Sequence, residues 1–133
     1  MPVYVTDTHP LVWYATAHHK KLSPKVLRLF READQDLALI YVSAAVLWEI
    51  TVLLKAGKVR LFEPFAQWAA ALLAKRGFEL APLDLAVVTE SLHLALLDDP
   101  FDAAIVATAK LKDLPLITKD KLITDSQIVE VAW

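Results

Sequence analysis

Segments typical of strands and segments typical of helices alternate along this chain from one end to the other. Short runs rich in aliphatic, β-branched or aromatic residues predict strands over 3–6, 37–42, 78–83, 115–118 and 128–131. Apolar periodicity and capping residues predict helices over 11–17, 24–33, 44–56, 62–76, 85–97 and 100–112. This alternation predicts an α/β fold with a mainly parallel sheet and right-handed crossovers.

The length and composition agree with such a fold. The 133 residues are enough for one domain, and no repeat or linker divides them. Hydrophobic residues make up 56% of the chain and the mean hydropathy is +0.42, which favours a sheet covered on both faces. The apolar run 37–48 is shorter than the ~20 residues that a membrane span needs. We expect a single domain over 1–133 and, without cysteines or the basic start of a signal peptide, a cytoplasmic location.

The composition also excludes several kinds of site. Gly57 and Gly77 are the only glycines, so neither of the glycine-rich nucleotide-binding loops can be written in this sequence. The absence of cysteine excludes zinc ribbons, iron–sulfur clusters and thiol nucleophiles. A formal net charge of −2 provides no overall attraction to nucleic acid.

Three aspartates are placed where elements of the predicted sheet begin or end. Asp7 directly follows the first strand, and Asp120 follows the strand 115–118 after one residue. Asp102 lies in the first turn of the helix that Pro100 opens. Because the carboxyl ends of parallel strands meet at one edge of the sheet, where such folds bind ligands, we expect these acids to converge.

Glu49 is the most informative acidic residue. Its helical neighbours three and four positions away are all apolar, and no lysine or arginine lies within one turn. A carboxylate on an apolar stripe is costly unless it is paired, protonated or bound to a metal. Glu49 follows Ser43 by about 9 Å along the helix axis, so it can face the same edge of the sheet.

Each acid also has a purely structural explanation. Capping of helices accounts for Asp7, Asp99 and Asp120, a favourable position in the helix dipole accounts for Asp102, and Glu49 can pair with a distant lysine or lie at an interface. These explanations are compatible with metal binding. Clustered carboxylates raise one another's pKa unless a cation intervenes, and oxygen-only ligands suit Mg²⁺ or Mn²⁺. Such an ion can activate water and neutralise a phosphoryl oxygen, which favours phosphodiester hydrolysis.

Four segments of the chain carry a family resemblance: 5–9 (VTDTH), 43–50 (SAAVLWEI), 99–109 (DPFDAAIVATA) and 116–120 (LITKD). In this order and spacing they resemble the PIN-domain ribonucleases, and specifically the VapC toxins of bacterial and archaeal toxin–antitoxin systems. The resemblance implies a three-layer α/β/α fold with a five-stranded parallel sheet, usually as a homodimer. It also implies an endoribonuclease that depends on Mg²⁺ or Mn²⁺, cuts tRNA or rRNA and is inhibited by a cognate VapB antitoxin.

The same resemblance assigns the site residues. Asp7, Glu49, Asp102 and Asp120 match the acidic quartet of the family, and Asp99 matches an aspartate of the subgroup that has the Asp-Pro-Phe-Asp sequence. The quartet is expected to bind the metal and to carry the catalysis, with Asp99 as a further candidate ligand.

The chain departs from the family where basic residues are usual. Leu97-Asp98 stands where a histidine and a basic residue usually precede Asp99, and Ala103 stands where arginine usually follows Asp102. The missing cations leave RNA-phosphate contacts in question. One alternative is therefore an inactive PIN module that only binds a protein partner. Another is a phosphoryl-transfer protein of haloacid-dehalogenase or receiver type, which is less favoured because no second acid follows Asp7 closely.

Other residues have weaker signals. Lys25, Arg28 and Arg31 recur every three residues and are typical of a solvated helix face, with an RNA-binding stripe as the alternative. Trp13 and Tyr14 are candidates for partner contact. The hydroxyls of Thr8 and Thr118 are candidates for orienting the metal ligands.

Overall fold

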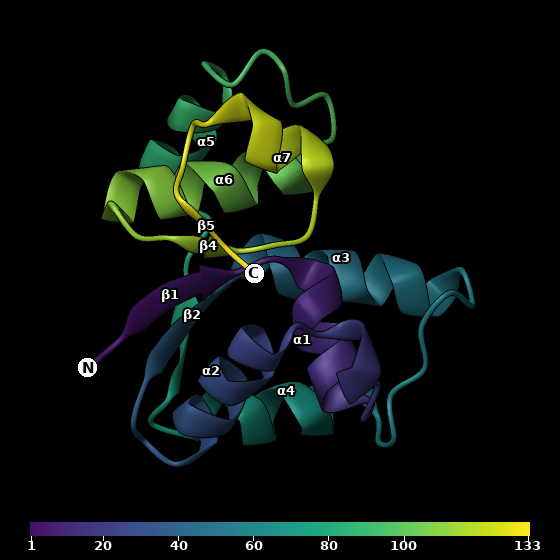
Figure 1. Cartoon of the computed structure of the whole chain (residues 1–133). Helices are drawn as coiled ribbons and strands as arrows, with labels where there is room; N and C mark the ends of the chain where they lie inside the picture. Colours follow the sequence, from purple (N-terminus) through teal and green to yellow (C-terminus); the bar gives the residue numbers. More distant parts are fainter.

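A computed structural model describes all residues from Met1 to Trp133. Its centre is a five-stranded sheet in the order β3-β2-β1-β4-β5, and every neighbouring pair is parallel (Figure 1). The strands are β1 (Val3–Thr6), β2 (Leu39–Ser43), β3 (Phe78–Ala81), β4 (Leu116–Ile117) and β5 (Val131–Ala132). The predicted α/β class and the parallel sheet are confirmed.

Helices cover both faces of the sheet and complete a three-layer α/β/α arrangement. They are α1 (Thr8–Ala15), α2 (Pro24–Asp34), α3 (Ala44–Lys55), α4 (Phe65–Leu73), α5 (Leu85–Ser91), α6 (Pro100–Lys112) and α7 (Lys121–Ser126), with a short 3₁₀ helix, η1 (His19–Lys21). In Figure 1, α5, α6 and α7 lie above the sheet, and α1, α2 and α4 lie below it. No helix has the length and apolar character needed to cross a membrane.

The register of the sheet brings three strand ends to the same level. Thr6, the last residue of β1, pairs with Val42 of β2 and with Ile117 of β4. The residues that follow these strands, among them Asp7 and Thr118, therefore emerge side by side at the carboxyl edge. Helix α3 starts from β2 at this edge and contacts both α1 and α6.

The core runs through the sheet into α6. Its 30 buried hydrophobic residues form one continuous cluster. On α6 the segment 103–109 is buried throughout, because small alanines let this helix approach the sheet while Ile105 and Val106 fill the space around it. This packing holds the first turn of α6 at the carboxyl edge.

Three predicted helices have different bounds in the structure. Helix α4 starts at Phe65 instead of residue 62, because the residue before Pro64 is disfavoured in a helix, and it ends at Leu73 instead of residue 76. Helix α5 ends at Ser91 instead of residue 97, and the chain beyond it buries Leu94 and Leu97 in the core. Helix α1 begins at Thr8, earlier than predicted, because a proline in the first turn needs no hydrogen-bond partner.

The two glycines have different roles, and one differs from its predicted role. Gly57 follows α3 with φ +69°, as expected of a glycine that ends a helix. Gly77, predicted to close a helix, is buried at the start of β3, where a Cβ would lie 1.8 Å from the carbonyl oxygen of Ala33. Close contact between backbones explains this glycine.

Candidate metal centre

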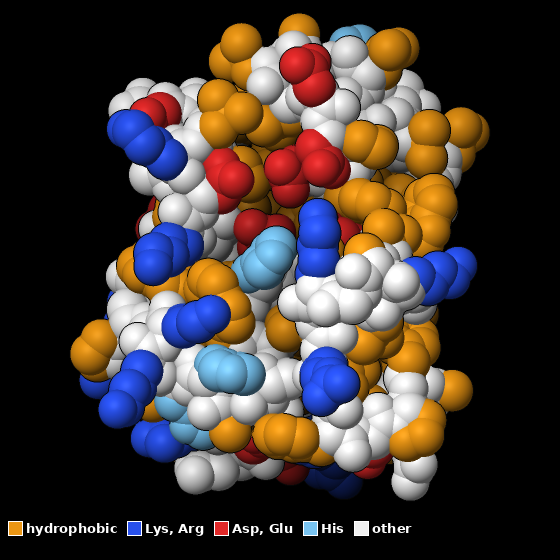
Figure 2. All heavy atoms as spheres, turned by 90° about the vertical axis from the view of Figure 1, so that its right-hand side faces the viewer, with side chains coloured by type: hydrophobic (Ala, Val, Ile, Leu, Met, Phe, Trp, Pro, Cys, Tyr) orange, Lys and Arg blue, Asp and Glu red, His pale blue; other side chains and the backbone are white.

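Five carboxylates from four parts of the chain lie along the carboxyl edge of the sheet, and we call them the acidic rim: Asp7, Glu49, Asp99, Asp102 and Asp120. Asp7 and Asp120 follow β1 and β4, Glu49 lies on α3, and the other two open α6. Figure 2 views the molecule from this side and shows acidic side chains gathered in a hollow, with lysine, arginine and histidine side chains around its lower part.

Asp7 is the most deeply buried member of the rim, with 8% of its surface exposed. One carboxylate oxygen caps α1 by accepting from the backbone N–H of Thr8 at 2.8 Å. The other accepts from the hydroxyl of Thr118 at 2.7 Å. The same hydroxyl oxygen accepts from the backbone N–H of Asp120 at 3.1 Å, so Thr118 links the end of β1 to the start of α7.

Glu49 is half-buried, and its only hydrogen-bond donor is the hydroxyl of Thr8. It makes no ion pair, so the interpretation that a distant lysine neutralises it is wrong. The expectation that Thr8 and Thr118 orient the acids agrees with these contacts, since each hydroxyl donates to a rim carboxylate.

Asp99 and Asp120 cap helices as expected. Asp99 Oδ1 accepts from the backbone N–H groups of Phe101 and Asp102, at 2.8 and 3.2 Å. Asp120 Oδ1 accepts from the N–H of Ile123 at 2.9 Å. The second oxygen of each aspartate, and both oxygens of the Asp102 side chain, have no donor within the protein. Capping therefore occupies only part of the available oxygen atoms.

The rim carboxylates influence one another strongly. Burial, together with the charges of Asp7, Asp99, Glu49 and Asp120, raises the pKa of Asp102 from 3.8 to about 7. Burial also raises the pKa of Glu49, as do Asp7 and Asp99, although the Thr8 hydroxyl opposes this change. These shifts show that the rim acids lie in one electrostatic field, which the sequence alone could only suggest.

Burial is also the largest cause of the pKa shift of Asp7. Burial raises its pKa despite the opposing hydrogen bonds from Thr118 and Thr8. His9 lowers the pKa of both Asp7 and Glu49 through its charge. Sequence reasoning gave His9 no role, and its only signal was its position two residues after Asp7.

The donor chemistry of the rim fits a hard divalent cation. All available ligand atoms are oxygens, and the three ion pairs of the protein, Lys75–Asp34, Lys110–Glu90 and Lys121–Asp125, involve none of the rim acids. No three acidic or histidine side chains approach closely enough in this structure to hold an ion between them. Mutual repulsion between uncompensated carboxylates opposes such an approach.

The remaining candidates behave differently from one another. Lys25, Arg28 and Arg31 are exposed on α2 without ion pairs, as expected of a solvated face. Tyr14 is engaged within the protein, because its ring stacks on Phe30 with centroids 4.9 Å apart and its hydroxyl donates to Asp34. Trp13 is half-buried, and the rings of His9 and Trp133 lie 5.9 and 6.4 Å from its ring, so only part of it is open to a partner.

Fold and rim together define a three-layer α/β/α protein with an acidic centre at the carboxyl edge of a parallel sheet. Within that class, the chain belongs to the PIN domain family, whose model matches residues 4–125. Domains of this family are typically nucleases that use divalent metal ions. Among curated proteins, no sequence matches significantly.

Solved VapBC structures and the structure of FitAcB contain chains of the same fold. Similarity to a chain of Rickettsia felis VapBC2, solved with a promoter DNA fragment, has a TM-score of 0.66 at 15% identity and covers 98% of this chain and 97% of that one. DNA-bound VapBC from Salmonella typhimurium gives a TM-score of 0.65 at 14% identity, with 99% and 98% covered. A chain of FitAcB from Neisseria gonorrhoeae gives a TM-score of 0.62 at 17% identity, and the match covers 96% of this chain and 95% of that one.

Proposed function

We propose that this protein is an endoribonuclease that depends on Mg²⁺ or Mn²⁺ and acts as the toxin of a VapBC-type toxin–antitoxin system, with tRNA or rRNA as substrate. The observation that carries the proposal is the electrostatic coupling of the acidic rim. Five carboxylates, none of which makes an ion pair, lie at the edge of a parallel sheet where such folds bind ligands. These carboxylates destabilise the folded state, and such destabilisation is consistent with a functional site.

The rim residues divide the proposed work among them. Asp7 and Asp102 would hold the principal ion, Glu49 and Asp120 would complete its coordination directly or through water, and Asp99 is a further candidate ligand. A bound Mg²⁺ or Mn²⁺ would supply an activated water and neutralise charge on a phosphoryl oxygen.

The chain's own residues prepare this centre. Thr118 holds one oxygen of Asp7 and Thr8 holds one oxygen of Glu49, so both acids are oriented before any ligand binds. Asp102, with a pKa of about 7, is divided between protonated and ionised forms at neutral pH. Only the ionised form can bind a cation, so metal binding would be accompanied by proton release.

The proposed partners are a VapB-type antitoxin and a second copy of this chain. The structural neighbours described as VapBC complexes support the antitoxin. A run of exposed apolar side chains on and after α5 supports the homodimer, and comprises Leu85, Val88, Leu92 and Leu96.

An inactive module that only binds a protein partner is the second candidate. Leu97-Asp98 and Ala103 favour it, because these positions lack the cations that commonly contact RNA phosphates in the subgroup. Titration of Mn²⁺ into the folded protein distinguishes the candidates by calorimetry. The absence of binding heat would favour the inactive module.

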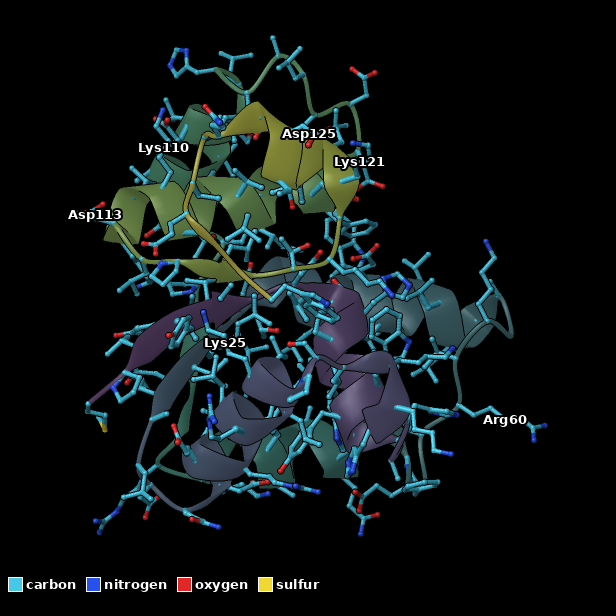
Figure 3. All side chains as sticks on the ribbon, in the orientation of Figure 1. Lys25, Arg60, Lys110, Asp113, Lys121 and Asp125 are labelled. Carbon is cyan, nitrogen blue, oxygen red and sulfur yellow. The ribbon has the colours of Figure 1, made fainter.

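The nuclease proposal is tested by removing one rim charge at a time. Asp7→Asn and Asp102→Asn should each abolish RNA cleavage in Mg²⁺ or Mn²⁺ while leaving the circular dichroism spectrum unchanged, because each removes an anionic ligand from the centre. Asp125→Asn is the matched control. Its side chain is exposed on α7, where Figure 3 shows it beside Lys121, with which it pairs at 2.9 Å. Undiminished cleavage by either rim variant would refute the assignment.

A further inference from the structure

A pocket lined by basic side chains lies on helices α1 and α3, which also carry part of the acidic rim. It has a volume of about 410 Å³, within the range of small-molecule sites, and lies between α1, the end of α3 and the loop that follows α3. We call it the basic pocket. Its lining includes Lys21, Lys58 and Arg60 together with His9, His18 and Trp13.

The positive charge of this pocket is not neutralised by the protein. No aspartate or glutamate is among its lining residues, and none of its three cationic side chains makes an ion pair. A pocket of similar size between α1, α2 and α4 contains Asp34 and Glu63 beside its basic residues. Figure 3 shows the Arg60 side chain extending outward, so this arginine is placed to act at the mouth of the basic pocket.

Trp13 gives the pocket an aromatic surface. Its ring is half-buried, and the ammonium groups of Lys21 and Lys119 lie 5.6 and 5.9 Å from it. The ring of His9 lies 5.9 Å away on the same helix. Aromatic rings flanked by cations are typical of sites that bind single-stranded nucleic acid, where bases stack on the rings and phosphates meet the cations.

The polar lining also includes an unused acceptor. The hydroxyl of Thr16 donates its only proton to the carbonyl of Val12 at 2.7 Å. The 2.7 Å contact between that hydroxyl and His18 Nδ1 therefore requires the proton on Nδ1. This leaves Nε2 of a neutral His18 as an acceptor without a protein partner.

The basic pocket and the acidic rim share the same two helices. His9 lines the pocket, and the preceding residue, Thr8, donates to Glu49. On α3, Leu53 lines the pocket four residues after Glu49, on the same face of the helix. A nucleic-acid strand that is bound at the rim would thus lie one helical turn from the basic pocket.

We propose that the basic pocket binds one nucleotide of the RNA strand beside the cleavage position, with its phosphate at Lys21 and Lys58 and its base on Trp13. This inference rests on the proposed nuclease function and specifies where the substrate is held. The pocket would supply positioning that Leu97-Asp98 and Ala103 do not provide. An RNA is favoured over an acidic peptide because a base stacks on the aromatic surface, whereas the carboxylate of an aspartate or glutamate does not.

Equilibrium binding of a fluorescein-labelled, short single-stranded RNA to the Asp7→Asn chain tests the pocket independently of cleavage. Lys21→Ala/Lys58→Ala should weaken binding, and the slope of log affinity against log salt should fall by about 0.7 for each lysine removed. Trp13→Leu should weaken binding by about 5- to 150-fold through lost stacking. Trp13→Phe should restore most of the affinity, since it keeps an aromatic ring.

The matched control removes the same charge elsewhere. Lys25→Ala/Arg28→Ala lies on the exposed face of α2, and neither residue lines the basic pocket. This control should leave the affinity and the salt slope unchanged. Lys21→Arg/Lys58→Arg should also bind RNA normally, which separates loss of charge from loss of packing.

The outcomes distinguish the pocket from the nuclease. Unchanged affinity and salt slope in Lys21→Ala/Lys58→Ala would overturn the pocket, as would displacement of the RNA by an oligoglutamate peptide at equal charge concentration. Cleavage is measured with chains that keep Asp7. If the parent chain cleaves RNA and Lys21→Ala/Lys58→Ala cleaves it with the same KM, the pocket proposal fails and the nuclease proposal stands. If the chain cleaves no RNA but binds it through these lysines, the nuclease fails and the pocket stands.

Discussion

Asp102 shows how a single residue of the rim works against the stability of the fold. Its side chain accepts no hydrogen bond, and its burial, together with the charges of four other carboxylates, raises its pKa to about 7. Between its unfolded pKa of 3.8 and this value, the folded state binds more protons than the unfolded state. Its contribution to the free energy of unfolding therefore falls as the pH rises through that window.

We expect Asp102→Asn to raise the melting temperature in EDTA above about pH 7 and to lose this advantage towards about pH 4, because asparagine cannot ionise. With added Mn²⁺ at high pH, the parent chain should melt at a higher temperature than Asp102→Asn, since a cation that binds only the folded rim stabilises the parent chain. Thermal denaturation across this pH range measures both effects, with Asp125→Asn as the control. A difference in melting temperature that does not vary with pH would contradict the prediction.

Among the elements, β3 and α2 meet more closely than their sequences suggest. Gly77 permits this contact because a Cβ at its position would lie 1.8 Å from the carbonyl oxygen of Ala33. Gly57, by contrast, has open space around it and a φ of +69°. The first glycine is required by packing and the second by backbone conformation.

Gly77→Ala should therefore lower the free energy of unfolding by about 3 kcal/mol or more, because backbone must move to relieve the overlap. Gly57→Ala should cost only about 1–2 kcal/mol, the strain of a left-handed conformation in a residue with a Cβ. Urea denaturation of both variants provides the comparison. Equal losses would show that the sheet can move away from α2 without cost.

At the scale of the whole molecule, the exposed apolar side chains on and after α5 form the surface that we propose for the dimer. Leu85 and Leu92 are 82% and 80% exposed, and Leu96 is 65% exposed. A twofold axis through such a patch would bury it against the same patch of a second copy.

We predict that the protein is a dimer and that Leu92→Glu shifts it to monomer, because a charge at the centre of an apolar interface is costly to bury. Light scattering coupled to size-exclusion chromatography measures the mass of each form. Leu122→Glu, at an exposed leucine of α7, is the control and should remain dimeric. A monomeric parent chain would exclude this interface.

The sequence by itself determined the α/β class, the parallel sheet and most helix starts. These features depend on periodicity and on contacts between near neighbours, such as Ser23 and Asp120 capping N–H groups three residues ahead. The same local logic singled out Glu49 as an acid on an apolar stripe. It could not show that Thr8 would be its hydrogen-bond donor.

The tertiary structure decided the features that depend on distant parts of the chain. Thr118 holds Asp7 from 111 positions away, and Gly77 meets the backbone of α2 only after β3 joins the sheet. The register of three strands brings the rim acids into one electrostatic field, and the turn after α3 brings Lys58 to the pocket that Trp13 lines. Such relations follow from how whole elements pack, since burial and long-range Coulomb energy depend on the assembled fold rather than on neighbouring residues.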